Sequence, residues 1–357
     1  MMSARGSSMW GRFALVGAAA VAVLTALPPA AAAAVRRVPA HYPTIQAAVD
    51  AAGAGDLIDV APGRHCGARV DRQVTLLGHG RATIIGCADG PALSNGVRAG
   101  FQLPGADGAS GASGTHIEGF VFDGRGISAD NLEPLGVAII ATFASHVRVE
   151  RNVILGTVQG ITNTAGDSWL IVHNVIRDLT VFDCTGALCA GGDGIVIQIA
   201  RDPIAVPGGP ETAGNRPKDN VVLGNVIEGA IPDGFEAFDM AGVFVFAADR
   251  TVVARNRLSL PDNPNAEAEG IGVLVDNSCC GLPAIVPGAR NTVVTFNDGR
   301  DSQRAVEIDG TGGENTQGLV LFGNAGTVMV EGTVIEGRTP RHRRFGHAGR
   351  FRHCTLH

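Results

Sequence analysis

Acidic side chains gather in three segments of this sequence, residues 178–193, 228–239 and 262–269. Together these segments hold ten carboxylates, and Arg177 is the one basic residue beside them. Clustered carboxylates bind Ca²⁺ or sugar hydroxyls, and a close pair shares protons at raised pKa values. The alternative is that acidic loops keep the protein in solution. The candidate catalytic carboxylates are Asp183, Asp193, Asp233, Glu236 and Asp239.

The segment 233–239 is the densest in acid and also contains two aromatic rings. Phe235 and Phe238 are suited to stack on a sugar ring, so we predict that they bind ligand. Ca²⁺ is a possible cofactor of such a segment, although the sequence assigns no metal ligands.

The elements that must position these side chains come from two short apolar sequence motifs that repeat along the chain, called here the first and the second phrase. In the first phrase an apolar run ends at an asparagine, and the residue three places earlier is always apolar. The asparagines are Asn152, Asn174, Asn225, Asn256, Asn297 and Asn324. The apolar residues before them are Val149, Ile171, Val222, Val253, Val294 and Leu321. Stacked coils need such a fixed apolar column, because each coil buries its inward side chains against its neighbours.

The second phrase places a small residue before alternating β-branched positions, as in residues 194–197. Two strands per unit, with no helical period between residues 60 and 335, predict an all-β solenoid. The residues expected to point outward from this phrase are Ala138, Thr162, Val196, Phe244, Gly272 and Glu307. Only Glu307 among them could perform acid–base chemistry, which argues against a conventional hydrolase groove on this face.

We expect the asparagine column to mark one corner of every coil. Asparagine tolerates left-handed backbone angles, and stacked amides hydrogen-bond along the axis as ladders. The residues just before three of these asparagines, Arg151, His173 and Arg255, are candidate ligands for a polyanion or simple solvent contacts. Arg148, Arg201 and Arg255 are conceivable bases for a lyase. If the acidic segments share another corner, they form one rim.

Within such a rim, acidic residues of neighbouring coils should meet. We expect Asp233, Glu236 or Asp239 to approach Asp183 or Asp193, within reach of a metal ion or a sugar.

The two ends of the chain differ from the repeats. Residues 1–34 have a basic start, an apolar core and small residues at the exit, which predicts a secretory signal, with an uncleaved anchor as the alternative. Residues 337–357 carry six arginines and four histidines but no acid. Such a tail is typically disordered, or it binds an anionic polymer or the acidic body. We therefore expect a secreted or periplasmic β-helix domain at 35–336, with no later membrane span.

Net charge limits the kinds of partner that the protein can bind, and the cysteine content indicates disulfides. Residues 35–336 hold 20 basic and 34 acidic residues, a net charge of −14, so nucleic acid is not expected as a partner. Seven cysteines in an exported chain favour disulfides over metal sites, since no C-x-x-C pair is present. The candidate disulfide cysteines are Cys66 with Cys87, about one coil apart, and Cys184 with Cys189.

Residues 41–63 predict a cap for the exposed end of the solenoid. A short helix should begin at residue 43 or 44 and end at Gly53, and Leu57–Val60 should form the first strand. The apolar face of this helix consists of Ile45, Ala48 and Val49.

The stretches Thr44–Ala48 and Gly55–Gly63, with the repeats up to about residue 335, resemble the right-handed parallel β-helix proteins of the pectin-lyase-like superfamily. The resemblance implies a right-handed single-stranded parallel β-helix with a short N-terminal capping helix. The superfamily includes lyases, polygalacturonases, pectin methylesterases, uronan epimerases, phage tailspikes and adhesive proteins, whose sugar enzymes usually work in a groove along one face.

The compact motifs of the polygalacturonases, methylesterases and epimerases are missing from this sequence, and so is the Met- and His-rich pattern of a copper site. A calcium-dependent lyase has no compact motif and stays open. Two functions follow. The first is an exported β-helix protein that binds polysaccharide or another surface polymer. The alternative is a polysaccharide lyase or glycoside hydrolase that acts on uronic-acid-containing polymers through the acidic corner loops.

Overall fold

The structure is a computed structural model. It describes residues 33–106, 110–128, 130–185, 188–190, 192–200, 216–235, 239–276, 288–309, 317–330 and 333–336. The described residues belong to the unit that begins at Ala33. The predicted signal segment, apart from its last two residues, and the predicted tail at 337–357 lie outside the described residues.

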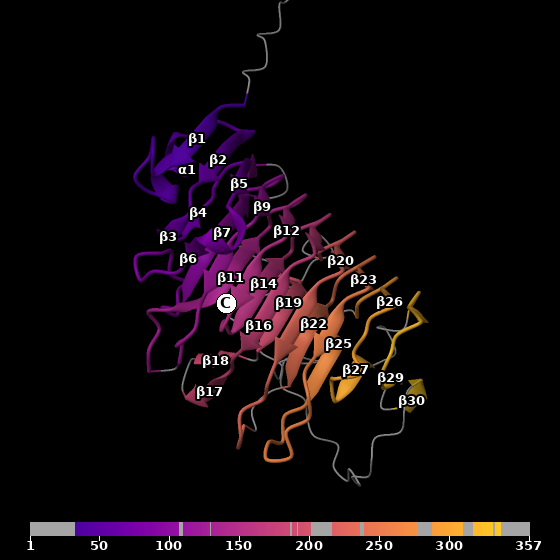
Figure 1. The fold of residues 1–357 in the computed structure, drawn as a ribbon. Helices are drawn as coiled ribbons and strands as arrows, with labels where there is room; N and C mark the ends of the chain where they lie inside the picture. The colour runs from indigo at the N-terminus through magenta and orange to yellow at the C-terminus, as the bar shows by residue number, and fades with distance from the viewer. Residues whose placement is uncertain are drawn as a thin grey trace, which may run out of the picture. The chain divides into compact units, whose positions relative to one another are not determined.

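Nearly every element of this unit is a short strand, and the strands build three long sheets (Figure 1). Sheet A runs in the order β1 (Val35–Val38), β2 (Asp56–Val60), β5 (Val74–Leu77), β9 (His116–Glu118), β12 (Arg148–Glu150), β15 (Leu170–Val172), β20 (Val221–Leu223), β23 (Val252–Ala254), β26 (Val293–Thr295), β28 (Val320–Phe322). Sheet B runs in the order β3 (Gly63–His65), β6 (Thr83–Ile85), β10 (Val121–Asp123), β13 (Val153–Leu155), β16 (Val175–Leu179), β21 (Val226–Gly229), β24 (Arg257–Ser259).

Sheet C runs in the order β4 (Ala68–Arg69), β7 (Arg98–Ala106), β11 (Leu135–Thr142), β14 (Gln159–Thr164), β19 (Asp193–Gln198), β22 (Met240–Phe246), β25 (Gly270–Asp276), β27 (Arg304–Ile308), β29 (Val328–Val330), β30 (Thr333–Glu336). The remaining elements are β8 (Ser110–Gly111), β17 (Phe182–Thr185), β18 (Leu188–Ala190), the helix α1 (Ile45–Ala51) and the 3₁₀ turn η1 (Gly80–Ala82). No helix within the described residues is long and apolar enough to cross a membrane.

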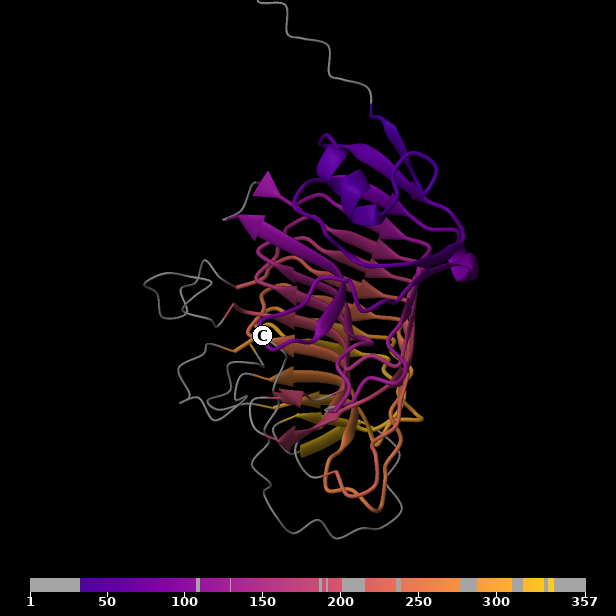
Figure 2. The same cartoon turned by 90° about the vertical axis from the view of Figure 1, so that its left-hand side faces the viewer.

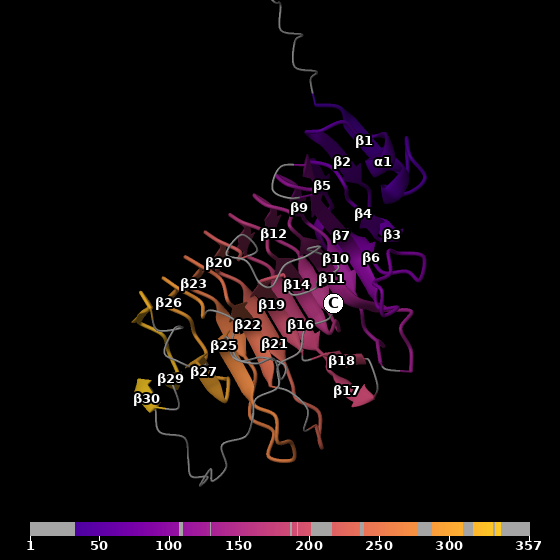
Figure 3. The same cartoon turned by 180° about the vertical axis from the view of Figure 1, so that it is seen from behind.

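From β2 to β25 the chain visits the three sheets in turn, so that each circuit adds one parallel strand to each sheet, and the later circuits extend sheets A and C. From β12 in sheet A it passes to β13 in sheet B and β14 in sheet C, and then returns to β15 in sheet A. Figure 2 shows the strands of successive circuits lying in layers, and Figure 3 shows sheet B from behind. This architecture is a right-handed parallel β-helix, as the sequence predicts.

The apolar column predicted from the first phrase fills the interior. Val149 pairs with Ile171 in register, and the same column continues through the next four coils to Leu321. All of its members are fully buried except Leu321, which is half-buried in the last coil. Each buried Val, Leu or Ile contributes about 1.5–3 kcal/mol to folding.

The asparagine column forms a continuous hydrogen-bonded ladder at the corner between sheets A and B. Asn225 illustrates the pattern. Its Oδ1 accepts from the Asn174 backbone N–H at 2.9 Å and from Asn174 Nδ2 at 3.1 Å. Its own Nδ2 donates to Ile171 O and to Asn256 Oδ1, both at 3.0 Å. The predicted amide ladder is therefore confirmed from Asn152 to Asn324.

The left-handed backbone expected of these asparagines belongs instead to the residue before each of them. Positive φ angles occur at Arg151, His173, Gly224, Arg255, Phe296 and Gly323. The asparagine itself closes the corner through its side chain, because its amide satisfies buried backbone groups that the turn leaves without a partner.

The small residue of the second phrase is required by close backbone approach. A Cβ atom on Gly160, Gly194, Gly242 or Gly272 would lie 2.3–2.6 Å from a carbonyl oxygen of the next coil. Ala138 occupies this column in the earlier coil, and its side chain is in the core. The prediction that Ala138 and Gly272 point outward is therefore wrong. The register places Ile140 and Leu274 in the outward column instead, beside Thr162 and Phe244.

The N-terminal cap forms as predicted. The Thr44 hydroxyl oxygen accepts from the Ala47 N–H at 3.1 Å and caps α1, whose Ile45, Ala48 and Val49 are buried. Strand β1 precedes the helix and pairs with β2, which the sequence analysis did not anticipate.

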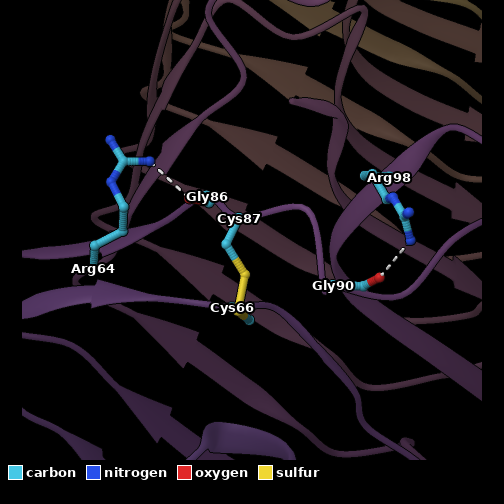
Figure 4. The surroundings of a disulfide bond; sticks show 6 residues. All are labelled: Arg64, Cys66, Gly86, Cys87, Gly90 and Arg98. Carbon is cyan, nitrogen blue, oxygen red and sulfur yellow. Dashed lines mark hydrogen bonds between the residues drawn. A yellow bond between two sulfur atoms is a disulfide. The ribbon is translucent and has the colours of Figure 1, made fainter. Parts of the chain in front are cut away.

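The disulfide between Cys66 and Cys87 is confirmed (Figure 4). It links two consecutive coils of sheet B, and the Arg64 guanidinium beside it donates to Gly86 O at 2.7 Å. Cys184 and Cys189 lie in the paired strands β17 and β18, but their side chains are outside the described residues, so this pairing stays a prediction.

We predict that Asn225→Ala lowers the free energy of unfolding by about 2–4 kcal/mol, because it removes four hydrogen bonds and leaves buried backbone groups unsatisfied. Urea unfolding followed by circular dichroism measures the change. The matched control is Asn131→Ala, since this asparagine is exposed and its side chain makes two local bonds, in which Nδ2 donates to Gly126 O and Oδ1 accepts from the Glu133 N–H. Equal losses in the two variants would contradict a structural role for the ladder.

Candidate functional site

The outward face of sheet C changes character along the stack. Its central column runs Ile140, Thr162, Val196, Phe244, Leu274 and Glu307. The neighbouring column ends Ala241, Ile271 and Arg304. Val196, Phe244, Phe246, Ile271 and Leu274 are buried together as a second apolar cluster outside the main core. Charged side chains replace this apolar surface at β27.

An ionic cluster occupies this position, and we call Glu269, Arg304 and Glu307 the carboxyl–guanidinium cluster. Arg304 Nη1 donates to Glu307 Oε1 at 2.5 Å, and Arg304 Nη2 donates to Glu269 Oε1 at 2.6 Å. Arg304 opens β27, Glu307 lies three residues along the same strand, and Glu269 immediately precedes β25. One guanidinium thus bridges two carboxyl groups from neighbouring coils.

The cluster adjoins the corner from which the acidic segments leave. Segments 180–192, 230–239 and 260–269 each connect a strand of sheet B to a strand of sheet C, so they share one corner as predicted. Asp239 Oδ1 accepts from the Glu269 N–H at 2.7 Å, and Gln303 Oε1 accepts from the Gly270 N–H at 3.1 Å. These bonds fix the end of the segment that carries Glu269.

Burial raises the pKa of both carboxyl groups of the cluster. Desolvation raises the pKa of Glu307 to about 7, against the opposing charge of Arg304. Desolvation also raises the pKa of Glu269 to about 7, and the negative charges of Asp239 and Asp262 add to the effect, while Arg304 opposes it. Carboxyl groups with such a pKa exchange protons near neutral pH, which is the property that general acids and bases need.

Of the five predicted catalytic carboxylates, the structure describes the side chains of Asp193, Asp233 and Asp239, and the catalytic role of the five stays a prediction. Asp193 is buried in β19 and pairs in register with Gln159 and Ala241. The exposed Asp233 accepts from Asn263 Nδ2 at 2.9 Å and from Asn265 Nδ2 at 3.3 Å, and these bonds lower its pKa. Asp239 approaches Glu269 of the following coil. The side chain of Asp183 and the whole of Glu236 lie outside the described residues.

The predicted ligand-binding residues are also separated. Phe235 is buried in the main core, and Phe238 lies outside the described residues. Arg151, His173 and Arg255 share the corner between sheets A and B, away from sheet C. Their role as ligand contacts stays a prediction. Glu307 was predicted to be an outward acid and Glu269 belongs to a predicted acidic segment, whereas no sequence pattern pointed to Arg304.

A second polar cluster lies on the outward face of sheet A. His116, Glu118 and Glu150 come close enough together to hold a metal ion. Arg151 Nη2 lies 2.6 Å from Glu118, and Arg148 Nη2 lies 2.7 Å from Glu150. Because two guanidinium groups already neutralise these carboxylates, the arrangement is an ion-pair network and a poor cation site.

Comparison with known proteins supports the fold. No protein-family model and no curated protein sequence matches the chain. Among solved structures, PfbA, a surface adhesin of Streptococcus pneumoniae, is similar with a TM-score of 0.50 and 12% identity, over 80% of this chain and 75% of the adhesin. A pectin methylesterase is similar with a TM-score of 0.42 and 10% identity, over 90% and 92% of the two chains.

A glycoside hydrolase is similar with a TM-score of 0.42 and 12% identity, over 76% of this chain, which spans 38% of the length of that enzyme. Identities this low show the shared fold.

We predict that the pH dependence of stability reports the carboxyl–guanidinium cluster. Both carboxyl pKa values rise from 4.5 in the unfolded chain to about 7 in the fold. Between these values the folded state holds more protons, so the free energy of unfolding should fall by about 1–3 kcal/mol as pH rises from about 5 to about 8. Glu307→Gln should reduce this slope, as thermal unfolding at several pH values measures.

The matched control is Glu228→Gln, which removes an exposed carboxylate 3.1 Å from Arg177. The control should keep the wild-type slope, because the pKa of the cluster does not depend on that pair. A slope that is unchanged in Glu307→Gln would exclude a raised pKa at this position.

Proposed function

We propose that this chain is an exported β-helix protein that binds a polysaccharide at the carboxyl–guanidinium cluster. The observation that carries the proposal is the replacement of apolar side chains on the outward face of sheet C by Arg304 and Glu307, with Glu269 bonded to the same guanidinium. The side chains of Glu269 and Arg304 keep 14% and 16% of their surface exposed, so a ligand can reach them.

The chemistry of the cluster favours a hydroxyl-rich ligand. Arg304 already donates to both carboxyl groups, so the free capacity of the cluster is in carboxylate oxygens that accept hydrogen bonds. Sugar hydroxyls supply such donors. The net charge of −14 over residues 35–336 repels a polyanion unless Ca²⁺ bridges the two. A neutral polysaccharide is therefore the ligand class that we propose.

Two observations support export. The disulfide Cys66–Cys87 belongs to an oxidising compartment. The sequence of residues 1–34 has the order of a secretory signal. The similarity to a surface adhesin concerns the fold, so the binding role rests on the cluster itself.

Binding can be tested by affinity electrophoresis of the mature chain in gels that contain neutral or acidic polysaccharides, with and without Ca²⁺. We expect retardation by at least one neutral polysaccharide, and about tenfold weaker binding in Glu269→Gln, because charge-assisted hydrogen bonds are lost. Glu228→Gln should bind as the wild type. Equal retardation of all three proteins would place the binding surface elsewhere, and no retardation would refute the proposal.

The raised pKa values favour a second candidate, a lyase or hydrolase. One carboxyl group would donate a proton to the leaving oxygen while the other, ionised, acts as base. We expect release of unsaturated or reducing sugar ends with an optimum near pH 7. The rate should fall roughly 10²–10⁴-fold in Glu307→Gln. Inertness on neutral and uronic-acid polymers would exclude the enzyme and leave the binding protein.

A further inference from the structure

The two edge strands of sheet A differ in charge and in what covers the core beside them. At the N-terminal end the helix α1 covers the core, and the edge strand β1 carries Arg36 and Arg37. Charged residues on an edge strand discourage pairing with other chains. At the C-terminal end β28 is the last strand, and among the described residues no strand pairs with its outer edge. This strand has the sequence Val320-Leu321-Phe322, without a charge.

Exposed apolar side chains concentrate at this C-terminal edge. Among the described residues five large hydrophobic side chains are exposed. Phe296, Val320 and Phe322 lie in the last two strands of sheet A or directly after them, and Val334 lies in β30 of sheet C. Phe322 is 60% exposed and packs edge-on against the Phe296 ring, with centroids 5.2 Å apart. Leu321, the last member of the core column, is half-buried. Among the described residues, nothing covers the core at the end of the stack as fully as α1 does at its start.

The asparagine ladder also stops here without completion. Each earlier ladder asparagine donates its backbone N–H to the next asparagine, as Asn297 does to Asn324 Oδ1 at 3.1 Å. Asn324 has no such acceptor within the described part of the chain, although its Nδ2 still donates to Val294 O. In the described part of the chain, the strand edge, the core column and the ladder therefore all end on the same side of the stack.

We propose that this surface pairs with a second copy of the chain in a tail-to-tail dimer. A second copy presents the same uncharged edge and the same half-covered core. The tail at 337–357 is a poor alternative, because its six arginines and four histidines are the kind of charged residue that discourages strand pairing at an edge. A two-fold axis at Leu321 would make β28 antiparallel to its equivalent and set Val320 opposite Phe322 of the partner subunit.

The contact is expected to be weak. One three-residue strand and its flanking side chains cover much less than the roughly 800 Å² per partner of a standard interface. We therefore expect a dimer whose dissociation constant is on the order of micromolar. This inference is independent of the polysaccharide site, which lies on sheet C.

Sedimentation velocity of the mature chain over a wide range of concentrations tests the proposal. The wild type should shift from monomer to dimer and stop there. Val320→Lys combined with Phe322→Lys should weaken association at least about 100-fold, because like charges would face each other across the axis. Both positions are exposed, so circular dichroism should show an unchanged fold, and Val320→Lys alone provides a milder variant.

The matched control is Val35→Lys, which charges an exposed valine (46% of its surface) at the opposite edge. It should dimerise as the wild type. Loss of association in this control, or growth beyond a dimer, would indicate head-to-tail stacking and overturn the proposal. A wild type that stays monomeric would also overturn it. Dimers that appear only after removal of residues 337–357 would show that the tail covers the edge instead.

Discussion

The structure depends on the register between coils, and the buried asparagine ladder fixes that register. Asn152, Asn174, Asn225, Asn256, Asn297 and Asn324 each accept bonds from the coil before them through Oδ1. A slip of one residue would turn the core column outward and break the ladder at the same time. Because the corner is fixed in every coil, insertions elsewhere change the loops and leave the sheets in place.

The same register explains how a site arises from residues far apart in sequence. Ile271 lies beside Arg304 and Leu274 lies beside Glu307 because β25 and β27 are neighbours in sheet C. Glu269 immediately precedes β25, so it reaches the Arg304 guanidinium of the next coil. The corner segments that carry Asp239 and Glu269 can vary in length without moving the contact between Glu269 and Arg304. Each segment must lead into the first residue of a sheet C strand, and the register of the sheet fixes that residue.

Sequence patterns predicted the parts of this fold that repeat. The apolar residue three places before each asparagine, the ladder itself and the cap around α1 all follow from chemistry that recurs in every coil or in the terminal cap. The outward column was misplaced at Ala138 and Gly272 because the first glycines of their two coils, Gly136 and Gly270, each lie two residues before the column of close approach. Backbone proximity to the next coil decides that column, and sequence alone does not reveal it.

The candidate site was harder to predict because burial creates its properties. In sequence, Glu269 does not differ from the other acids of the corner segments, and its raised pKa comes from burial in the fold. Arg304 belongs to no sequence pattern that would mark it as a site residue. Asp233, in the densest acidic stretch, is exposed and bonded to two loop asparagines, which lowers its pKa. The density of acids in sequence therefore indicated the corner between sheets B and C, whereas burial, which the sequence does not show, distinguishes Glu269 from Asp233 there.

Energetics suggest that the carboxyl–guanidinium cluster serves something other than stability. Exposed pairs such as Arg250 with Asp219 contribute about 0–1 kcal/mol each and cost little to form. A largely buried trio is different, because removing three ionisable groups from water costs several kcal/mol that the ion pairs only partly offset. In the preceding coil, Ile271 and Leu274 fill the same columns with apolar side chains, which avoids the desolvation cost of charged groups. A solenoid that could have continued this apolar filling instead holds Arg304 and Glu307 there, and a ligand that needs their charge is the simplest reason to retain them.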